Sequence, residues 1–256
     1  LASKWGSKTP VIVSKRTDFP VKSPGKFNHS NMKQILCVSN KISEITKSSV
    51  ASPERVKTVY SGIDTKRFEG EQKDIRDLIG LPKNAVLVGN CSALAPHKDY
   101  FTFIEVAKRF PELQFVIIGD GPLEAELKSY GAGLKNLHFT GFLKNIESYL
   151  KSLDYFLMTS ETEGLGTSLL DAMICRIPIV ATRAGGIPEI VIEGETGLNA
   201  EIKSVEQLSS QLQRYLENES LREKLVHNAY QNVMSHFTRE KTAENTLKIY
   251  QDVLSY

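Results

Sequence analysis

Residues 154–173 read DYFLMTSETEGLGTSLLDAM and indicate the fold class most clearly. It opens with an apolar run over 154–159 that lacks alternation of polar and apolar residues, which is typical of a strand covered on both faces. Gly164 and Gly166 then allow the backbone to turn tightly, and a helical pattern follows over 167–174. A buried strand, a glycine turn and a helix in this order are one unit of a parallel α/β sheet.

The same alternation of short apolar runs and helical patterns continues on both sides of this stretch. Most of the apolar runs are rich in Val, Ile, Leu and Phe, as expected of strands that lie between two layers of helices. We therefore predict an α/β fold with a Rossmann-like parallel sheet and helices on both of its faces. The expected strands are residues 10–14, 34–38, 56–60, 85–91, 114–119, 137–140, 154–159 and 177–182.

The composition is that of an ordinary globular protein. The chain has 256 residues, of which 41% are hydrophobic and 24% are charged, so collagen-like, low-complexity and disordered chains are excluded. The formal net charge of +2 is too small for a dedicated nucleic-acid binder, and we expect no nucleic-acid partner. Residues 1–50 hold nine Lys and Arg against two acidic residues, which favours either contact with an anionic surface or a solvated lysine-rich face.

Two features of the sequence bear on the cellular compartment. Cys37, Cys91 and Cys175 are far apart and no two of them form a CxxC pair, which favours buried thiols in a reducing compartment. No apolar run approaches the ~20 residues that span a bilayer, and no apolar core of a signal peptide follows residues 1–9. We expect a cytoplasmic protein, with peripheral contact to the inner face of a membrane as an open option.

Two carboxylates mark the glycine turn as a candidate site. Glu163 lies on the turn, and Asp171 lies about two helical turns further along the chain. The start of the helix offers unpaired N–H groups and a positive dipole end, which suit electron-rich oxygens. Carboxylates accept hydrogen bonds from paired hydroxyls, so the two acids suit a sugar better than a phosphate. The alternatives are charge complementarity at the helix start for Glu163 and a solvated helix position for Asp171.

Three further loops follow apolar runs, at the edge where open α/β sheets bind ligands. Lys98 lies in one of them, where its ammonium suits a diphosphate, although a surface lysine is the alternative. Gly119 and Gly121 begin like the G-x-G of a dinucleotide site, but Glu124 replaces the third glycine. A tight strand-to-helix turn is therefore favoured over a hydride-transfer enzyme. The last loop, residues 181–190, contains a Gly-Gly pair before a Pro-started helix.

Taken in order, these loops resemble the donor-binding half of the GT-B fold retaining glycosyltransferases of the group 1, family 4 type. The family's E-G-x-G-x-x-x-x-E motif reads EGLGTSLLD here, over residues 163–171. The resemblance covers roughly residues 10–256 and includes three more motifs. YSGID (residues 60–64), followed by Phe68, corresponds to the hinge motif N-G-I-D…F. GDGP (119–122) corresponds to G-x-G-P, and VATRAGGIPE (180–189) corresponds to V-A-T-x-x-G-G-x-P-E.

The resemblance implies a nucleotide diphosphate sugar as donor, a glycan or lipid-linked acceptor, and no metal ion or other cofactor. Lys98 would hold the diphosphate and Glu163 would accept hydroxyls of the transferred sugar, and these two are the candidate catalytic residues. Asp171 would hold the ribose hydroxyls. The other donor-binding candidates contribute glycine turns, backbone N–H groups or a surface for the base: Gly164, Leu165, Gly166, Thr167, Gly119, Gly121, Phe142 and Leu143.

Three positions depart from the family pattern. Asp171 stands where Glu is more frequent, so its carboxylate is one methylene shorter. Ala93 stands where the family often has an Arg, and Asp99 follows Lys98 where Gly is usual. The absent cation bears on donor affinity rather than on the fold.

The resemblance also implies a division of the chain. We expect residues 1–60 to be a remnant of the N-terminal, acceptor-side domain together with the hinge. Residues 61–237 would form the Rossmann-like donor-binding domain, and residues 238–256 a helix that crosses back. A complete acceptor-side sheet does not fit in the first part.

The favoured function is a hexosyltransferase that acts in polysaccharide biosynthesis and transfers its sugar with retention. Two alternatives stay open, a non-catalytic nucleotide-sugar binding module and a GT-B-fold epimerase that acts on the same donors. A glycoside hydrolase is disfavoured, because its two carboxyl groups flank the scissile bond about 5–10 Å apart. Glu163 and Asp171 instead come from one turn and one helix, on one side.

Overall fold

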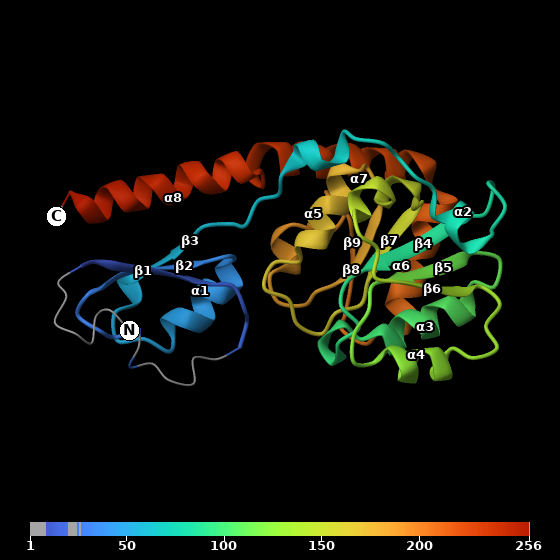
Figure 1. Ribbon diagram of the computed structural model, residues 1–256, viewed down its shortest axis with the longest axis horizontal. Helices are drawn as coiled ribbons and strands as arrows, with labels where there is room; N and C mark the ends of the chain where they lie inside the picture. Colours follow the sequence, from blue (N-terminus) through green and yellow to red (C-terminus); the bar gives the residue numbers. More distant parts are fainter. Residues whose placement is uncertain (1–8, 20–24, 26, 256) are drawn as a thin grey trace.

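Two parallel sheets of unequal size form the protein, described by a computed structural model over residues 9–19, 25 and 27–255 (Figure 1). The larger sheet has the strand order β6-β5-β4-β7-β8-β9, and the smaller has the order β1-β2-β3. The strands are β1 Val11–Lys15, β2 Met32–Cys37, β3 Val56–Thr58, β4 Leu87–Cys91, β5 Gln114–Ile118, β6 Leu137–Gly141, β7 Tyr155–Met158, β8 Ile179–Thr182 and β9 Leu198–Ala200.

Helices alternate with these strands along the chain. The α-helices are α1 Asn40–Lys47, α2 Ile75–Ile79, α3 Tyr100–Arg109, α4 Glu124–Tyr130, α5 Thr167–Ile174, α6 Val205–Glu217, α7 Glu219–His236 and α8 Arg239–Leu254. Short 3₁₀ helices are η3 Pro53–Arg55, η4 Thr65–Phe68, η5 Pro96–Lys98, η6 Ile146–Ser148, η7 Leu150–Ser152 and η8 Ile187–Glu189. Below, the N-terminal unit means β1–β3 with α1, and the large unit means β4–β9 with α2–α7.

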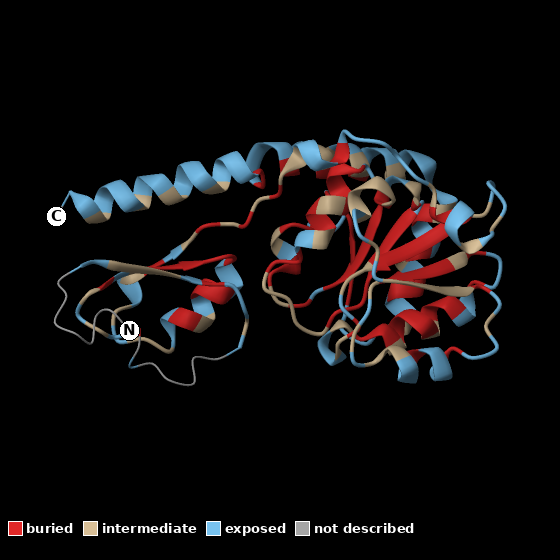
Figure 2. Cartoon of the chain, viewed as in Figure 1, coloured by how far each residue is buried: buried red, intermediate tan, exposed pale blue. Residues whose placement is uncertain are grey.

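The larger sheet is covered by helices on both faces, which confirms the predicted fold class. Successive side chains of a strand point to opposite faces, and β7 shows the result. Phe156 and Met158 join a core that includes residues of α5 and α7. Tyr155 and Leu157 join a second core built with α3, α4 and α6. Figure 2 shows most strands of this sheet as buried ribbons between the helices, while the edge strand β6 is of intermediate burial.

The order of the strands reverses between β4 and β7. From β4 the chain proceeds through β5 to β6 at one edge, and it then returns to the other side of β4 with β7, β8 and β9. At such a reversal the chain connections diverge, and ligands bind there at the carboxyl ends of the strands. The loop with Lys98 follows β4 and the loop with Glu163 follows β7. The topology therefore places the two candidate catalytic residues on neighbouring strands.

Two crossing segments join the N-terminal unit to the large unit. Residues 60–64 follow β3, and residues 237–242 lead into α8, so the chain passes between the units twice (Figure 1). The segments are hydrogen-bonded to each other: Ile63 N donates to Phe237 O (2.9 Å) and Arg239 N donates to Ile63 O (2.8 Å). The connection between the units is thus a paired, ordered structure rather than a single loose linker.

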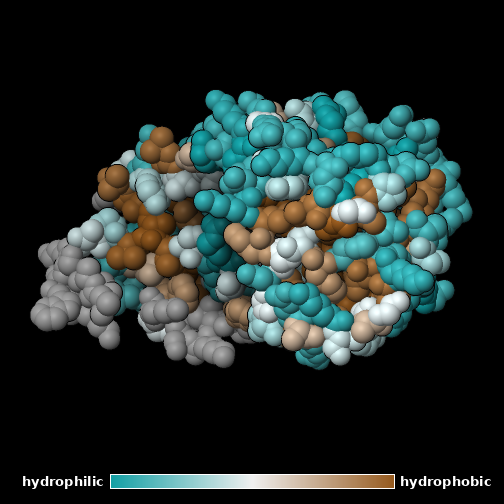
Figure 3. Space-filling view, turned by 45° about the vertical axis from the view of Figure 1, so that its right-hand side comes forward, coloured by the Kyte–Doolittle hydropathy of each residue, from teal (hydrophilic) through white to brown (hydrophobic). Residues whose placement is uncertain are grey.

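Helix α8 runs from the crossing segments along the N-terminal unit (Figure 1). It contains no buried residue among those the structure describes, and Leu247, Tyr250 and Leu254 on it are exposed. Figure 3 shows hydrophobic residues gathered on the visible surface of the N-terminal unit as well. Within the described ranges, no helix has both the length and the apolar character that crossing a membrane requires.

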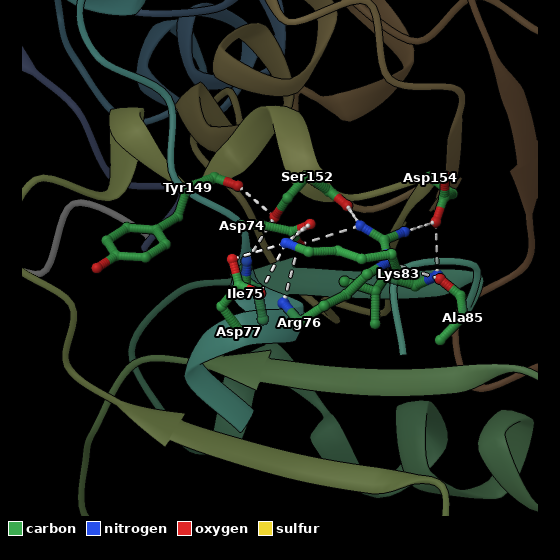
Figure 4. A network of polar contacts seen from close by, with 10 residues as sticks. Asp74, Ile75, Arg76, Asp77, Lys83, Ala85, Tyr149, Ser152 and Asp154 are labelled. Carbon is green, nitrogen blue, oxygen red and sulfur yellow. Dashed lines mark hydrogen bonds and ion pairs between the residues drawn. The ribbon is translucent and has the colours of Figure 1, made fainter. Parts of the chain in front are cut away.

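A buried guanidinium ties helix α2 to the starts of β4 and β7 (Figure 4). Arg76 donates to Asp154 Oδ2 (2.5 Å) and to the carbonyl oxygens of Ala85 and Ser152 (2.8 Å each). It also donates to Asp74 Oδ1 (3.2 Å). Removal of the side chain would take this donor from both carbonyl oxygens, whereas Asp154 Oδ2 would keep its hydrogen bond from Leu87 N (2.7 Å).

We expect Arg76→Ala to lower the free energy of unfolding by about 3 kcal/mol, because it removes the side-chain donor of the Ala85 and Ser152 carbonyl oxygens and the charge partner of Asp154. Urea denaturation followed by circular dichroism measures the change. Lys83→Ala is the matched control, because Lys83 contacts Asp74 and Asp77 from an exposed position. Similar losses in the two variants would contradict this role for Arg76.

Candidate functional site

The loops that follow β4, β7 and β8 meet at the carboxyl edge of the larger sheet. We call residues 92–99, 159–166 and 183–186 the loop cluster. Lys98 ends the short helix η5 in the first loop, and Glu163 lies in the second. The strand reversal brings these two residues into contact although 65 positions separate them in the sequence.

The Lys98 ammonium and the Glu163 carboxylate form an ion pair, with 2.5 Å between Nζ and Oε1. Their side chains are only 16% and 10% exposed, so solvent and salt screen the pair weakly. Ser160 Oγ donates a second hydrogen bond to Glu163 Oε1 (2.9 Å). One positive charge and one acceptor carboxylate thus share a partly buried position, which suits an anionic ligand that also carries hydroxyl groups.

Threonine hydroxyls fix the backbone around this pair. Thr159 Oγ1 donates to Asp99 O (2.9 Å) and lies 3.1 Å from Lys98 O. Thr182 Oγ1, at the end of β8, donates to Ser160 O (2.6 Å). The sequence alone does not single out these hydroxyl residues, because Ser and Thr after an apolar strand are common in any loop.

The backbone of Asp99 explains one departure from the family pattern. Asp99 has φ +46°, in the left-handed region that favours glycine. Aspartate is one of the few other residues that adopt this region, because its short side chain forms local hydrogen bonds. Here Oδ1 accepts from Thr102 N (3.3 Å) and Oδ2 accepts from Thr102 Oγ1 (2.6 Å), which caps helix α3. The cap compensates for the conformational freedom that glycine would supply.

Glycines allow the third loop to lie against the second. Gly185 has φ +54°, and a Cβ there would lie 1.9 Å from Glu163 O. Gly186 N donates to that same carbonyl oxygen (3.1 Å), and a Cβ on Gly186 would lie 2.4 Å from Gly164 O. Any larger residue at either position would push the third loop away from Glu163.

Helix α5 begins four residues after Glu163. Gly166 precedes the helix with φ +86°, and no side chain caps the first turn. Leu165 is buried in the core, which anchors the turn, and Thr167 is the first helical residue. The first-turn N–H groups and the positive end of the helix dipole form an environment that suits phosphate oxygens.

Asp171 is a shielded carboxylate with unused hydrogen-bonding capacity. Among the described residues, none donates to its solvent-shielded Oδ1. Burial raises the pKa of Asp171 to about 6, while the positive charge of Arg67 opposes the rise and Glu147 adds to it. The carboxyl group therefore changes its charge near pH 6, and Oδ1 is a shielded acceptor without a protein donor among the described residues.

The other predicted donor-binding residues are placed as follows. Gly119 and Gly121 have φ +137° and +156° and lie against the backbone of the first loop; a Cβ on Gly119 would lie 2.2 Å from Ser92 O. Phe142, directly after β6, is 71% exposed, and Leu143 packs partly against the core. The two glycines shape the loop that carries Lys98, and Phe142 offers an exposed aromatic surface.

The sequence matches the family described as "Glycosyl transferases group 1" over residues 71–232. N-acetyl-alpha-D-glucosaminyl L-malate synthase of Bacillus anthracis is 28% identical over 239 residues, covering 90% of this chain and 62% of the relative. UDP-Gal:alpha-D-GlcNAc-diphosphoundecaprenol alpha-1,3-galactosyltransferase of Escherichia coli is 24% identical over 237 residues, covering 86% of this chain and 60% of the relative. The crystal structure of Anabaena Alr3699/HepE in complex with UDP and glucose has a TM-score of 0.82 at 20% identity, covering 99% of this chain and 74% of that one.

The chain spans about three-fifths of the length of these two curated relatives. The likeness to the Anabaena structure shows a common fold, and it includes both sheets because almost the whole chain is covered. The family match runs from before α2 into α7 and contains all three loops of the loop cluster. It also covers well over half of the residues, and the chain therefore belongs to the glycosyl transferases group 1 family.

Proposed function

We propose that this chain is the donor-binding part of a glycosyltransferase that moves a sugar from a nucleotide diphosphate sugar to a glycan or lipid-linked acceptor, with retention of configuration. The Lys98–Glu163 ion pair carries the proposal, because it lies at the strand reversal and Glu163 is on the loop that leads into α5. An ammonium, first-turn N–H groups and a carboxylate are the groups that a diphosphate-linked sugar requires.

Lys98 and the start of α5 share the stabilisation of the diphosphate in this proposal. When the bond between the anomeric carbon and the diphosphate oxygen breaks, the electron pair stays on the diphosphate, whose negative charge grows. An ammonium and N–H groups that are already in place lower the energy of that state. The acceptor oxygen bonds to the anomeric carbon on the face from which the diphosphate departs, and the proton of the acceptor hydroxyl passes to the diphosphate. This charge balance requires no metal ion or other cofactor.

The remaining contacts follow from the placement of the acceptor groups. Glu163 accepts hydroxyls of the transferred sugar when Lys98 turns to the phosphates. Asp171, which is partly exposed, accepts the ribose hydroxyls through its carboxylate. Phe142 and Leu143 flank the base. Backbone N–H groups of residues 164–167 contact sugar and phosphate oxygens.

The names of similar proteins support these substrate classes. The Anabaena structure holds UDP and glucose, and the Escherichia coli relative takes a diphosphoundecaprenol-linked acceptor. UDP-glucose is therefore the first donor to test. A lipid-linked acceptor also accords with a peripheral position at the inner face of a membrane, toward which the basic excess of residues 1–50 would turn.

The division of the chain is part of the same proposal. Residues 61–237 are the donor-binding domain, residues 1–60 belong to the acceptor side and the hinge, and residues 238–256 form the crossing helix.

Calorimetric titration with UDP-glucose, GDP-glucose and ADP-glucose tests the proposed function. Binding of one donor, unchanged by a chelator, is expected, and failure of all three to bind would refute the nucleotide-sugar site. NMR of the incubated donor then distinguishes the functions. Transfer or slow hydrolysis with retained configuration identifies a transferase, an epimerised donor identifies an epimerase, and an unchanged donor identifies a binding module.

We expect Lys98→Ala to weaken UDP-glucose binding at least about tenfold, because a charge-assisted contact to the diphosphate is lost. Calorimetry measures the dissociation constant, and thermal unfolding verifies that the variant folds. Lys203→Ala is the matched control, since Lys203 pairs with Glu161 at an exposed position near the same edge of the sheet. An unchanged affinity in Lys98→Ala would remove Lys98 from the site.

Glu163→Gln should remove the preference for UDP-glucose over UDP while UDP itself still binds. The amide cannot act as a charged acceptor for sugar hydroxyls, and Lys98 is released toward the phosphates. The ratio of the two dissociation constants, measured in one buffer, is the test. If the variant kept the wild-type ratio, Glu163 would have no role in holding the sugar.

The affinity for UDP-glucose should fall as the pH is lowered through about 6, by up to about tenfold per pH unit. Above this pH Asp171 is a carboxylate and accepts the ribose hydroxyls; below it the group is neutral and must lose its proton to bind equally well. UDP-glucose is the suitable probe, because its phosphodiester groups do not titrate in this range. Asp171→Asn should bind more weakly and without this pH dependence, and a wild-type profile in the variant would contradict the assignment.

A further inference from the structure

A carboxylate of the large unit holds the first turn of a helix in the N-terminal unit. Glu189, at the end of η8, accepts hydrogen bonds from Asn40 N (2.7 Å, at Oε2) and Lys41 N (2.8 Å, at Oε1). These are the first two residues of α1. The contact is long-range, since 149 positions separate Glu189 from Asn40. Each carboxylate oxygen thus receives one backbone donor from the other unit.

Both ends of this contact fit each other electrostatically. The first N–H groups of a helix have no partner within the helix, and the helix dipole makes this end positive. Within α1, Ser39 Oγ accepts only from Ile42 N (3.2 Å). Glu189 therefore completes a cap that the local sequence leaves unfinished.

Tyr60 extends this contact into a network. Its hydroxyl donates to Glu189 Oε2 (2.9 Å) and accepts from Asn40 Nδ2 (2.6 Å), and Thr58 Oγ1 donates to Asn40 Oδ1 (2.8 Å). Burial raises the pKa of the Tyr60 hydroxyl well above its usual value, and the hydrogen bond to Glu189 raises it further. The hydroxyl thus keeps its proton and remains a donor.

Tyr60 also belongs to the crossing segments. Its ring packs edge-to-face on Phe237, with 5.1 Å between the ring centroids. The carbonyl oxygen of Tyr60 accepts from Thr242 Oγ1 (2.8 Å), and this threonine hydroxyl accepts from Gly62 N (2.7 Å). One side chain thus connects the joint between the units to the Glu189 carboxylate.

The same segment of the large unit touches Glu163. Gly186, three residues before Glu189, donates to Glu163 O (3.1 Å). A Cβ on Gly186 would lie 3.0 Å from Ser39 Oγ, and a Cβ on Gly164 would lie 2.3 Å from Arg16 O. The N-terminal unit therefore lies in direct contact with the second and third loops of the loop cluster.

We propose that Glu189 is a positioning residue that seats helix α1 on the loop cluster and thereby fixes the backbone of Glu163. The Glu189 carboxylate holds α1, the adjacent Gly186 holds the carbonyl of Glu163, and Tyr60 links both to the crossing segments. Closure of the two units and the placement of the Lys98–Glu163 pair are coupled through this one carboxylate.

Hydrogen exchange of the free 256-residue chain, followed by mass spectrometry, tests the proposal without any ligand. In Glu189→Gln, peptides that cover residues 39–47 and 160–167 should exchange at least about tenfold faster than in the wild type. The amide keeps one acceptor oxygen but turns an NH₂ group toward the helix N–H groups. Tyr60→Phe keeps the ring on Phe237 and should give a smaller acceleration in the same peptides.

Glu195→Gln is the matched control, because Glu195 is an exposed acid on the segment that follows η8. Its exchange should equal that of the wild type, and peptides of α3 and α6 should be unchanged in all variants, which verifies folding. Wild-type exchange of residues 39–47 in Glu189→Gln would overturn the contact. Faster exchange confined to residues 39–47 would overturn the coupling to Glu163.

A binding measurement separates positioning from stability, and this readout rests on the proposed function. Glu189→Gln should reduce the preference for UDP-glucose over UDP, because Glu163 is displaced, while the affinity for UDP stays at the wild-type value. An unchanged preference would overturn the positioning role. If the wild type binds no nucleotide sugar, the proposed function fails, and the exchange of residues 39–47 and 160–167 decides on Glu189 independently.

Discussion

The reversal of strand order between β4 and β7 is the constraint on which the site depends. The loops that follow β4 and β7 lead toward opposite edges of the sheet. The carboxyl ends of these neighbouring strands therefore lie between the two loops, whose side chains face each other there. An ammonium on one loop and a carboxylate on the other then meet at 2.5 Å in a position that solvent reaches poorly. The pair is therefore a product of topology, and the glycines and threonines around it serve to keep the two backbones close enough for it to form.

The sequence was sufficient to predict the fold class and the loops, because periodicity and glycine turns are local signals. Each expected strand overlaps a strand of the structure. Strand β9 was not expected, because its three residues, LNA, include no β-branched or aromatic side chain. Lys98 and Glu163 are recognisable one at a time, but their contact depends on the order of strands in the sheet. Glu189 lies inside a quoted motif, yet its backbone partners are 149 and 148 positions away, and no local pattern indicates them.

Two departures from the family pattern differ in their physical consequences. Asp99 occupies a left-handed conformation and compensates with its own cap on α3, so the replaced glycine leaves the loop intact. Asp171 has a shorter side chain than glutamate and is held where burial raises its pKa to about 6. The first change is absorbed by local hydrogen bonds, while the second concerns a carboxyl group whose charge depends on its burial. A sequence pattern cannot distinguish these cases, since it records the residue and not its surroundings.

The paired crossing segments bring the two ends of the large unit together. Ile63 and Thr238 form a parallel bridge, so the large unit starts and finishes at nearly the same point, and the chain on both sides of it lies with the N-terminal unit. In this sense the large unit is inserted between the N-terminal unit and helix α8, and its two chain connections lie side by side. Domains whose ends are adjacent tolerate insertion into other chains and circular permutation. The gene segment for the large unit is therefore suited to exchange between related proteins without a new linker.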